Sequence, residues 1–374
     1  MWFFCKWFLK MKIKEIVSYI EEIAPISYQE SYDNSGLQIG KMDTEVDSAL
    51  LTVDITEEVI DEAILKNIKL IISHHPLIFG GVKRINGANF VERIIIKAIK
   101  NDIGIYSAHT NIDNVENGIN AKICEKLELQ NCKILVPRDN ELLKLVTFVP
   151  ISHLEMVKEA IFNTGAGHIG KYDCCSFSAE GTGTFRAQND ANPFVGKIGE
   201  IHHEKESKLE TIIPRFLKNK VINALLKVHP YEEVAYDIFP LENKLSDVGA
   251  GMIGELKEPI EEIKFFNHLK KTFNLSIIRH TELSGKKIKK IAVCGGSGSS
   301  FLKNAIAAKA DIFITGDFKY HQFFDAEGKI IIADVGHYES EQFSVELFND
   351  ILKKNIPNFA LYLSEIKTNP INYY

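Results

Sequence analysis

The sequence lacks the features that mark secreted, membrane-spanning and strongly basic proteins. Its six cysteines form no CxxC pair, so neither a disulfide framework nor a zinc knuckle is indicated. They are Cys5, Cys124, Cys132, Cys174, Cys175 and Cys294. This usage predicts reduced, mostly buried thiols and a cytoplasmic location. The net charge of −6 gives no whole-chain argument for nucleic-acid binding, because there is no basic excess to neutralise phosphates.

The first ten residues, MWFFCKWFLK, are apolar and aromatic but too short to span a bilayer. They also lack the basic segment and the small-residue cleavage site of a secretion signal. Helical spacing of apolar side chains, at Ile13, Ile16 and Ile20, begins only after Met11. We therefore interpret residues 1–10 as an N-terminal extension and Met11 as the start of the folded chain. The alternative is a short segment that touches a membrane surface.

The remaining chain is long enough for two domains, or for one domain with an insert. From residue 48 onward, apolar strands such as ALLTVD and IKLIIS alternate with helical patterns. The last third repeats this theme with KKIAVCG, DIFITGD and KIIIADVGHYESE. Such alternation predicts an α/β fold of βαβ units with a parallel or mixed sheet. The similarity of the two halves indicates a weak internal duplication, although many α/β chains share this texture.

Residues 144–241 have a different texture from the chain on either side. Strand-like runs such as LKLVTFVPI and SFSAEGTGTFRAQ and two helix-like stretches suggest the order β-α-β-β-α-β, the ferredoxin-like pattern. About 100 residues are enough for a complete small domain. We therefore predict a discontinuous core domain, residues 11–143 and 242–374, interrupted by an inserted domain at 144–241.

Histidines follow the strand IKLIIS directly. His74 and His75 lie at its carboxyl end, which is where ligand sites of open α/β sheets are found. Pro76 fixes the turn, so that both imidazole rings can face one cleft. Taken alone, HHP is equally compatible with two surface histidines in a loop.

Two further clusters favour a metal site. His109 and Asp113 lie four residues apart in AHTNID, and His337 and Glu341 lie four apart in GHYESE. Residues four apart on a helix share a face and can hold one ion together. Imidazole with carboxylate suits Zn²⁺, Fe²⁺ or Mn²⁺ better than Ca²⁺ or Mg²⁺. The absence of cysteine ligands argues against a structural zinc site.

Six motifs together resemble the Nif-three-like dinuclear-metal-centre hexameric family, whose members are often labelled GTP cyclohydrolase 1 type 2 homologues. They are SYDNSGLQIG, VDIT, SHHPLIF, HTNID, GDFKYHQ and GHYESEQF. The resemblance covers nearly the whole chain from about residue 11. It implies two divalent metal ions per subunit (Zn, Fe or Mn), held by His74, His75, Asp113, His337 and Glu341. It also implies that Glu341 bridges both ions.

The same resemblance has implications for architecture and assembly. It implies a Nif-three-like duplicated βαβ core with mixed sheets, and a homohexamer in which trimers form a toroid around the metal sites. Residues 144–241 look like the PII-like or CutA-like insert that some members carry. The motif VHPYEEVAYDIFPLEN near the end of this segment is part of that likeness.

Other polar residues near the motifs leave alternatives open. His109 is outside the five-ligand set and either handles protons beside the metals or supports a turn. His321 either lines the same cleft or caps a helix. For Asp33 and Asn34 we favour a turn over a role in orienting the site. The loop GGSGSS lacks the lysine of a P-loop; it could hold one phosphate on its amides, but tight packing of strand against helix is favoured.

Three functions are compatible with these features. Two ions sharing a carboxylate lie about 3.5–4 Å apart and lower the pKa of a water towards 7, which suits a hydrolase. The family label implies attack on the purine ring of GTP, although no residue specifies guanine. We therefore predict a metal-dependent hydrolase acting on a nucleotide or another phosphorylated small molecule, with no membrane partner. The alternative is a non-catalytic, metal-binding regulatory hexamer. A toroid that threads single-stranded nucleic acid is a third reading, which the net charge does not support.

Overall fold

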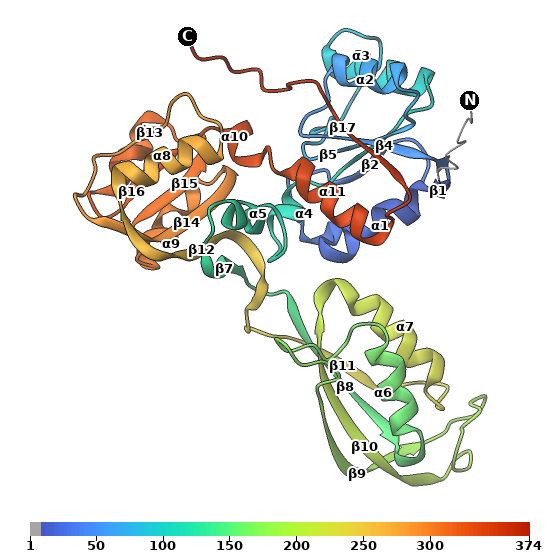
Figure 1. Cartoon of the computed structure of the whole chain (residues 1–374). Coiled ribbons are helices and arrows are strands. Elements are labelled where there is room, and N and C mark those ends of the chain that lie inside the picture. Colours follow the sequence, from blue (N-terminus) through green and yellow to red (C-terminus); the bar gives the residue numbers. More distant parts are fainter. Residues whose placement is uncertain (1–8) are drawn as a thin grey trace. The chain divides into compact units, whose positions relative to one another are not determined.

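The computed structural model describes residues 9–374 (Figure 1). The chain divides into two compact units. Pro137–Ser246 form one, here called the insert unit, and the chain up to Val136 joins Asp247–Tyr374 in the other, the core unit. The inserted domain predicted at 144–241 lies within the range of the insert unit. The interpretation of residues 1–10 as an extension falls mostly on residues 1–8, which lie outside the described part of the chain.

The first sheet of the core unit has five strands in the order β17-β4-β5-β6-β2. They are β17 (Ala360–Leu363), β4 (Ser48–Thr52), β5 (Leu70–Ser73), β6 (Gly104–Ser107) and β2 (Gly36–Ile39). The first four run parallel and β2 is antiparallel to β6. The helices of this half are α1 (Ile13–Ile23), η1 (Ile26–Tyr28), α2 (Glu57–Leu65), α3 (Phe90–Lys100), α4 (Thr110–Asp113) and α5 (Ile119–Lys126). A separate ribbon pairs β1 (Met11–Lys12) with β3 (Glu45–Val46).

The second sheet of the core unit has six strands in the order β13-β16-β15-β14-β12-β7. They are β13 (Arg279–His280), β16 (Ile331–Asp334), β15 (Ile312–Gly316), β14 (Lys287–Ser297), β12 (Leu245–Glu261) and β7 (Gln130–Arg138). Strands β14, β15 and β16 are parallel, while β12 and β13 are antiparallel to their neighbours. The helices here are α8 (Glu262–Thr272), η4 (Ser299–Phe301), α9 (Leu302–Ala307), η5 (Tyr320–Ala326), α10 (His337–Glu341) and α11 (Ser344–Asn355). The α/β fold with mixed sheets predicted from the sequence is confirmed.

Each half of the core unit contributes a strand to the sheet of the other half. Strand β7 comes from before the insert yet forms the edge of the second sheet. Strand β17 comes last in the chain yet pairs with β4 in the first sheet (Figure 1). Helix α11 follows the second sheet along the chain and packs against α1 and β4. This exchange ties the two halves together, and the candidate site draws residues from both.

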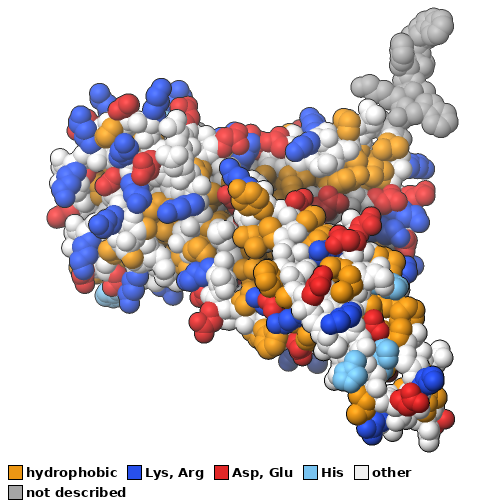
Figure 2. Space-filling model, turned by 90° about the horizontal axis from the view of Figure 1, so that it is seen from below, with side chains coloured by type: hydrophobic (Ala, Val, Ile, Leu, Met, Phe, Trp, Pro, Cys, Tyr) orange, Lys and Arg blue, Asp and Glu red, His pale blue; other side chains and the backbone are white. Residues whose placement is uncertain are grey.

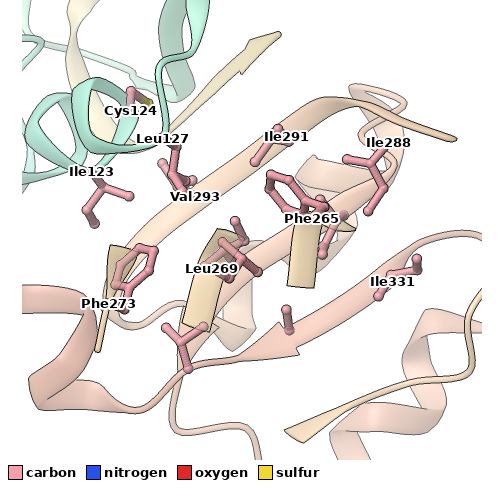
Figure 3. Packing of buried hydrophobic residues seen from close by; sticks show 14 of the residues in the cluster. Ile123, Cys124, Leu127, Phe265, Leu269, Phe273, Ile288, Ile291, Val293 and Ile331 are labelled. Carbon is pink, nitrogen blue, oxygen red and sulfur yellow. The ribbon is translucent and has the colours of Figure 1, made fainter. Parts of the chain in front are cut away.

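Side chains of β14 alternate between two cores, as a buried strand requires. Ile291 and Val293 pack with Phe265 and Leu269 of α8 (Figure 3). Ala292 lies between them in the sequence and belongs to a separate cluster that includes α9. Both faces of the second sheet are therefore covered by helices, which explains why its central strands read as continuous apolar runs.

Local sequence explains the helix starts of the first half. Thr56 was expected to cap a helix, and its hydroxyl accepts a hydrogen bond from the amide of Val59 at the start of α2. The apolar spacing after Met11 predicted a helix, and α1 buries Ile13, Ile16 and Ile20. Strand β12 and helix α8, in contrast, did not stand out in the sequence.

The insert unit holds a four-stranded antiparallel sheet in the order β11-β8-β10-β9. Along the chain its elements are β8 (Leu142–Pro150), η2 (Ile151–His153), α6 (Leu154–Phe162), β9 (Ser176–Arg186), β10 (Ile201–Pro214), η3 (Arg215–Leu217), α7 (Lys218–Val228) and β11 (Tyr236–Pro240). Helices α6 and α7 pack against each other, and a core of its own includes Val149, Ile161, Ile213 and Leu225. This unit therefore has the hydrophobic centre of an independent domain.

One face of the molecule is mixed in character, and the described cysteines are unpaired. Basic, acidic and hydrophobic side chains are interspersed on the face shown in Figure 2. Among residues 9–374 the longest helix has 12 residues, fewer than the roughly 20 needed to cross a bilayer. The five described cysteines are free, but only Cys124 and Cys294 are buried and Cys174 is exposed, so the expectation of mostly buried thiols holds in part. Cys5 lies outside the described residues.

Phe265 offers a test of this packing. The side chain is fully buried in the cluster of Figure 3, so Phe265→Ala should lower the free energy of unfolding by about 3–5 kcal/mol. Ile263 lies on the same helix and is 61% exposed, so Ile263→Ala serves as a matched control with a loss within about 0.5 kcal/mol. Urea unfolding of both variants measures the difference. Equal losses would contradict the packing described for α8.

Candidate metal centre

The first two histidines of the site, His74 and His75, follow strand β5, which pairs with the parallel strand β4. The amides of His74 and His75 donate to the carbonyls of Thr52 and Val53, so the end of β5 stays paired with the end of β4. The amide of Ala108 donates to Ser73 in the same way from the end of β6. The carboxyl ends of β4, β5 and β6 therefore meet at one edge of the sheet, as the sequence suggested for HHP.

The second half of the chain supplies His337 and Glu341 from one short helix, and Asp113 ends the short helix α4 of the first half. Gly336 follows β16 with φ of +93°, a left-handed conformation that glycine adopts without strain, and α10 begins at the next residue. His337 is the first residue of α10 and Glu341 the last. One helical turn thus places the imidazole and the carboxylate on the same face, with Nε2 of His337 3.0 Å from Oε2 of Glu341.

The glycine loop after β14 packs against this helix. Gly296 has φ of +64°, and a Cβ atom there would lie 2.2 Å from Oε1 of Glu341. The amides of Gly295, Gly296 and Gly298 donate to side chains, namely Asn120 Oδ1, Ser340 Oγ and Thr315 Oγ1. These three amides already have partners, so they are not available for the phosphate-binding alternative. The loop GGSGSS instead allows the backbone to approach Glu341 closely.

Five side chains converge and form two overlapping groups of three. His75, His337 and Glu341 make one group, and His74, Asp113 and Glu341 make the other. Glu341 belongs to both. Its Oε2 lies 2.8 Å from Nε2 of His75, and its Oε1 lies 3.6 Å from Nε2 of His74. The five residues expected to hold two ions are therefore brought together, with one carboxylate between the two groups.

Two buried atoms of the second group lack a hydrogen-bond partner among the described residues, and a cation between them would satisfy both. Nδ1 of His74 lies 3.0 Å from the carbonyl of Ala108 and must donate to it, so Nε2 carries a lone pair. That Nε2 lies 3.7 Å from Oδ1 of Asp113. Both atoms are buried without a hydrogen-bond partner. Two acceptors facing each other out of solvent are costly unless a positive ion lies between them.

The first group shows the same arrangement. Nδ1 of His75 lies 2.7 Å from Asp54, and Nδ1 of His337 lies 2.7 Å from Asp317. When the two imidazoles are neutral and these nitrogens donate to the carboxylates, both Nε2 atoms are acceptors, yet they lie only 3.2 Å apart beside Glu341. A divalent ion satisfies all three acceptors at once, so the donor set fits a metal of the Zn²⁺, Fe²⁺ or Mn²⁺ kind.

Carboxylates behind the imidazoles were missed in the sequence. Asp54 follows β4 and also accepts a hydrogen bond from the hydroxyl of Thr368, 2.7 Å away. Asp317 follows β15 at the equivalent position of the second sheet. Each is an aspartate directly after a buried strand, a signal that the motifs VDIT and GDFKYHQ contained. Such partners fix the ring orientation and the tautomer of a metal-binding histidine.

Asp33 plays the same part for His109. Its Oδ1 lies 2.8 Å from Nδ1 of His109, and its other oxygen accepts from the amide of Thr110. The amide of Asp33 donates to the carbonyl of Glu30 and closes a turn, so the turn that we favoured is present at Asp33. The prediction of a turn was incomplete, because the buried carboxylate of Asp33 also orients His109 of the site.

Charge and burial shift the pKa values of these groups strongly. Burial lowers the pKa of His74, whereas Asp54 and Glu341 outweigh burial and raise the pKa of His75 to about 10. Burial and the nearby Glu341 raise the pKa of Asp113 well above its usual value. Burial opposes ionisation of Glu341 too, but the surrounding imidazoles hold its pKa well below the usual range. The site is thus a place where negative charge attracts cations, whether protons or metal ions.

His109 is buried beside the rings of His74, His75 and Phe79. Its ring centroid is 5.3 Å from those of His74 and His75 and 5.6 Å from that of Phe79. It can also be grouped with these two histidines as a ligand set. Tyr32 stacks on Phe79, with centroids 6.5 Å apart and planes 25° apart, and both rings are more than half exposed.

His321 has a different setting. It lies in η5, is exposed, and contacts the rings of Tyr320 and Phe324. None of the contacts described for it involves Glu341 or the four other residues of the two groups. The contacts described for His321 therefore give no support to the catalytic role predicted from the motif.

Comparisons with known proteins match almost the whole chain. A family model described as Duf34/NIF3 (NGG1p interacting factor 3) matches residues 11–370. The chain belongs to this family. A curated Bacillus subtilis relative named GTP cyclohydrolase 1 type 2 homolog is 37% identical over 365 residues, which cover 96% of this chain and 98% of that protein.

Solved structures of family members share the fold. A Bacillus cereus protein related to NIF3 is 39% identical, with a TM-score of 0.84 over 97% of this chain and 99% of its own. A Staphylococcus aureus protein is 31% identical, with a TM-score of 0.75 and the same coverage. The resemblance inferred from the motifs is thus confirmed at the level of the family.

Glu341 is the residue whose loss should affect both ions. Glu341→Gln keeps the size of the side chain but removes the charge shared by the two groups, so the metal content should fall from about two equivalents per chain to one or fewer. Glu339→Gln makes the same change on the same helix outside both groups and is the matched control. Elemental analysis of both variants measures this. Two full equivalents retained in Glu341→Gln would rule out bridging.

Proposed function

We propose that this chain binds two divalent metal ions and uses them to hydrolyse a small substrate, a nucleotide or a related phosphorylated compound. The observation that carries the proposal is the position of Glu341 in both groups of three. A carboxylate shared by two sites is typical of two-metal hydrolases. One ion would be held by His75, His337 and Glu341, and the other by His74, Asp113 and Glu341.

The protein's own residues would orient the chemistry. When bound, such ions act as Lewis acids and make water nucleophilic at neutral pH. Asp54 and Asp317 hold two imidazoles in fixed tautomers, so that their Nε2 atoms face the centre. His109 is held by Asp33 through Nδ1. Its Nε2 atom is left to accept a proton from, or donate one to, a substrate, which is the proton-handling role predicted from the sequence.

The exposed aromatic pair supports a substrate with a planar ring. Phe79 contacts His109, and Tyr32 stacks on Phe79, with both rings more than half exposed. Exposed aromatic faces bind a heterocycle by stacking, which is worth about 1–3 kcal/mol per base in nucleic-acid complexes. A nucleobase next to the centre would meet this surface, which supports a nucleotide over a purely aliphatic phosphate ester.

The finer architecture and the assembly are part of the same proposal. The element order of the insert unit, with strands in the order β11-β8-β10-β9, supports a ferredoxin-like domain of the PII or CutA type. Family membership supports the homohexamer. A regulatory metal-binding hexamer is the alternative function, and an insert unit with its own core favours it.

Turnover of a nucleotide panel by metal-loaded protein separates the two functions. We expect His109→Ala to lower kcat by about 10²–10⁴-fold while the metal content stays nearly unchanged, because proton transfer is lost and the five ligands remain. His321→Ala should stay within about twofold of the parent chain, since the side chain is exposed and distant from those ligands in the described contacts. Full turnover in excess EDTA would exclude metal-dependent hydrolysis, whereas no turnover of any compound would favour the regulatory function.

Removal of the insert tests the domain boundaries that we propose. Nζ of Lys244 lies 3.3 Å from Oδ1 of Asp139, so the two ends of the inserted segment are adjacent. A chain in which a short Gly-Ser linker joins Asp139 to Lys244 should be soluble and should bind as much metal as the parent. Every ligand remains in such a chain. Size-exclusion chromatography with light scattering would show, in the same sample, whether the insert is needed for a hexamer. An insoluble or metal-free product would refute the boundaries.

A further inference from the structure

The motif VHPYEEV of the insert unit has no role in the metal centre, yet it lines a cavity. The cavity has a volume of about 570 Å³ and lies within the insert unit. Tyr231, Glu232 and Glu233 of the motif form part of its wall. The rest comes from β8, from the end of β9 with the loop that follows it, and from Glu206 of β10. A volume of this size suits a small organic ligand.

Aromatic rings form much of the wall. The ring centroid of Tyr231 lies 6.0 Å from that of Phe185 and 6.3 Å from that of Phe194. Their planes are inclined by 59° and 48°, so the rings do not stack flat on one another. Phe148 also lines the cavity. Rings at such angles present several π faces to one enclosed space, which is the arrangement that attracts organic cations.

A buried carboxylate lies among these rings. Glu206 is only 8% exposed, and its Oε1 accepts a hydrogen bond of 2.8 Å from the hydroxyl of Tyr231. Burial and the charge of Glu206 raise the pKa of Tyr231, which therefore keeps its proton and remains a donor. The side chain of Glu206 lies across β9 over Gly183, where a Cβ atom would be 2.0 Å from Oε2. Glycine at this position thus leaves room for the carboxylate.

The charged groups of the wall are mainly acidic. Glu206, Glu232 and Glu233 line the cavity, and Arg186 is the basic side chain among its lining residues. The amide of Asn192 donates to Oε2 of Glu232 and attaches the loop after β9 to the motif. A ligand with a negative charge would meet three carboxylates here. A ligand with a positive charge would find carboxylates for its charge and aromatic faces for its body.

We propose that this cavity binds a small organic ammonium compound with an aromatic or aliphatic body. The ammonium group lies beside Glu206 and the hydroxyl of Tyr231, and the body lies between Phe185 and Phe194. This site is separate from the metal centre, and the proposal does not depend on hydrolytic activity. Binding combines an ion pair with a largely buried carboxylate and cation–π attraction, each of which is stronger out of solvent.

Calorimetric titration of the full chain with 2-phenylethylammonium tests the proposal. 2-Phenylethanol has the same body without the charge and should bind at least about tenfold more weakly, as should 3-phenylpropionate. Glu206→Gln keeps an oxygen for the hydroxyl of Tyr231 and should weaken ammonium binding at least about tenfold. Equal affinities for the charged and neutral compounds, or no measurable binding of the ammonium compound, would overturn the proposal.

A pair of glycine variants separates the position of the carboxylate from the stability of the fold. Gly183→Ala would push Glu206 aside without changing any charge and should also weaken ammonium binding about tenfold. Gly181 lies two residues away on the same strand with nothing within 4 Å of an added Cβ atom, so Gly181→Ala should bind within about twofold of the parent chain. Phe194→Ala and the exposed Phe177→Ala provide the same comparison for the rings. Unchanged binding in both Glu206→Gln and Gly183→Ala, with unaltered melting temperatures, would refute the site.

Discussion

The candidate metal centre of the core unit depends on one constraint, namely that buried acceptor atoms face one another and require a positive charge between them. Nε2 of His74 and Oδ1 of Asp113 have no hydrogen-bond partner among residues 9–374, and Nε2 of His75 faces Nε2 of His337 across 3.2 Å. Such a group of acceptors destabilises a fold unless positive charge is bound. The surrounding aspartates increase the need for bound positive charge, because they accept the Nδ1 protons of the imidazoles and add negative charge. Binding of a metal ion to these groups would therefore be coupled in free energy to the folding of this region.

The exchange of strands between the two sheets explains how residues from distant segments meet. The first half brings His74, His75 and Asp113 to the carboxyl ends of parallel strands, and the second half brings α10. Strand β17 and helix α11 return to the first sheet immediately after α10, which fixes Glu341 against the ends of β5 and β6. A loosely hinged pair of halves could not keep these five side chains within the small tolerances that a dinuclear site would require.

The sequence made the five ligands visible because each follows a pattern with a physical cause. A pair of histidines after an apolar strand, and an imidazole four residues before a carboxylate, are local signals. Asp54 was not recognised, because its partner His75 is 21 residues away and the hydrogen bond between them depends on the register of β4 against β5. The same is true of Asp317 and His337, which are joined through β15 and β16.

Long-range pairing also explains which parts of the fold could not be predicted. Strand β12 includes glycine, proline and alternating charges, so its sequence lacks the apolar run that marked β5 or β15. It is a strand because β14 pairs with it. The sequence did not decide between phosphate binding and tight packing for the loop GGSGSS, for a similar reason. Its glycines are explained by Glu341, a residue 45 positions further along the chain than Gly296, and local sequence carries no trace of that contact.

The order in which the chain is synthesised gives the position of α10 a further consequence. His75 emerges from the ribosome 266 residues before Glu341, and Asp54 emerges 314 residues before Thr368, which holds its second oxygen. The early half can fold its parallel strands while the other half is still being made. It then presents histidines without the shared carboxylate, a partial site open to whichever metal is most abundant. In the proposed centre, final selection of the metal would thus be delayed until translation has passed α10, when the folded chain rather than the nascent one would set the coordination.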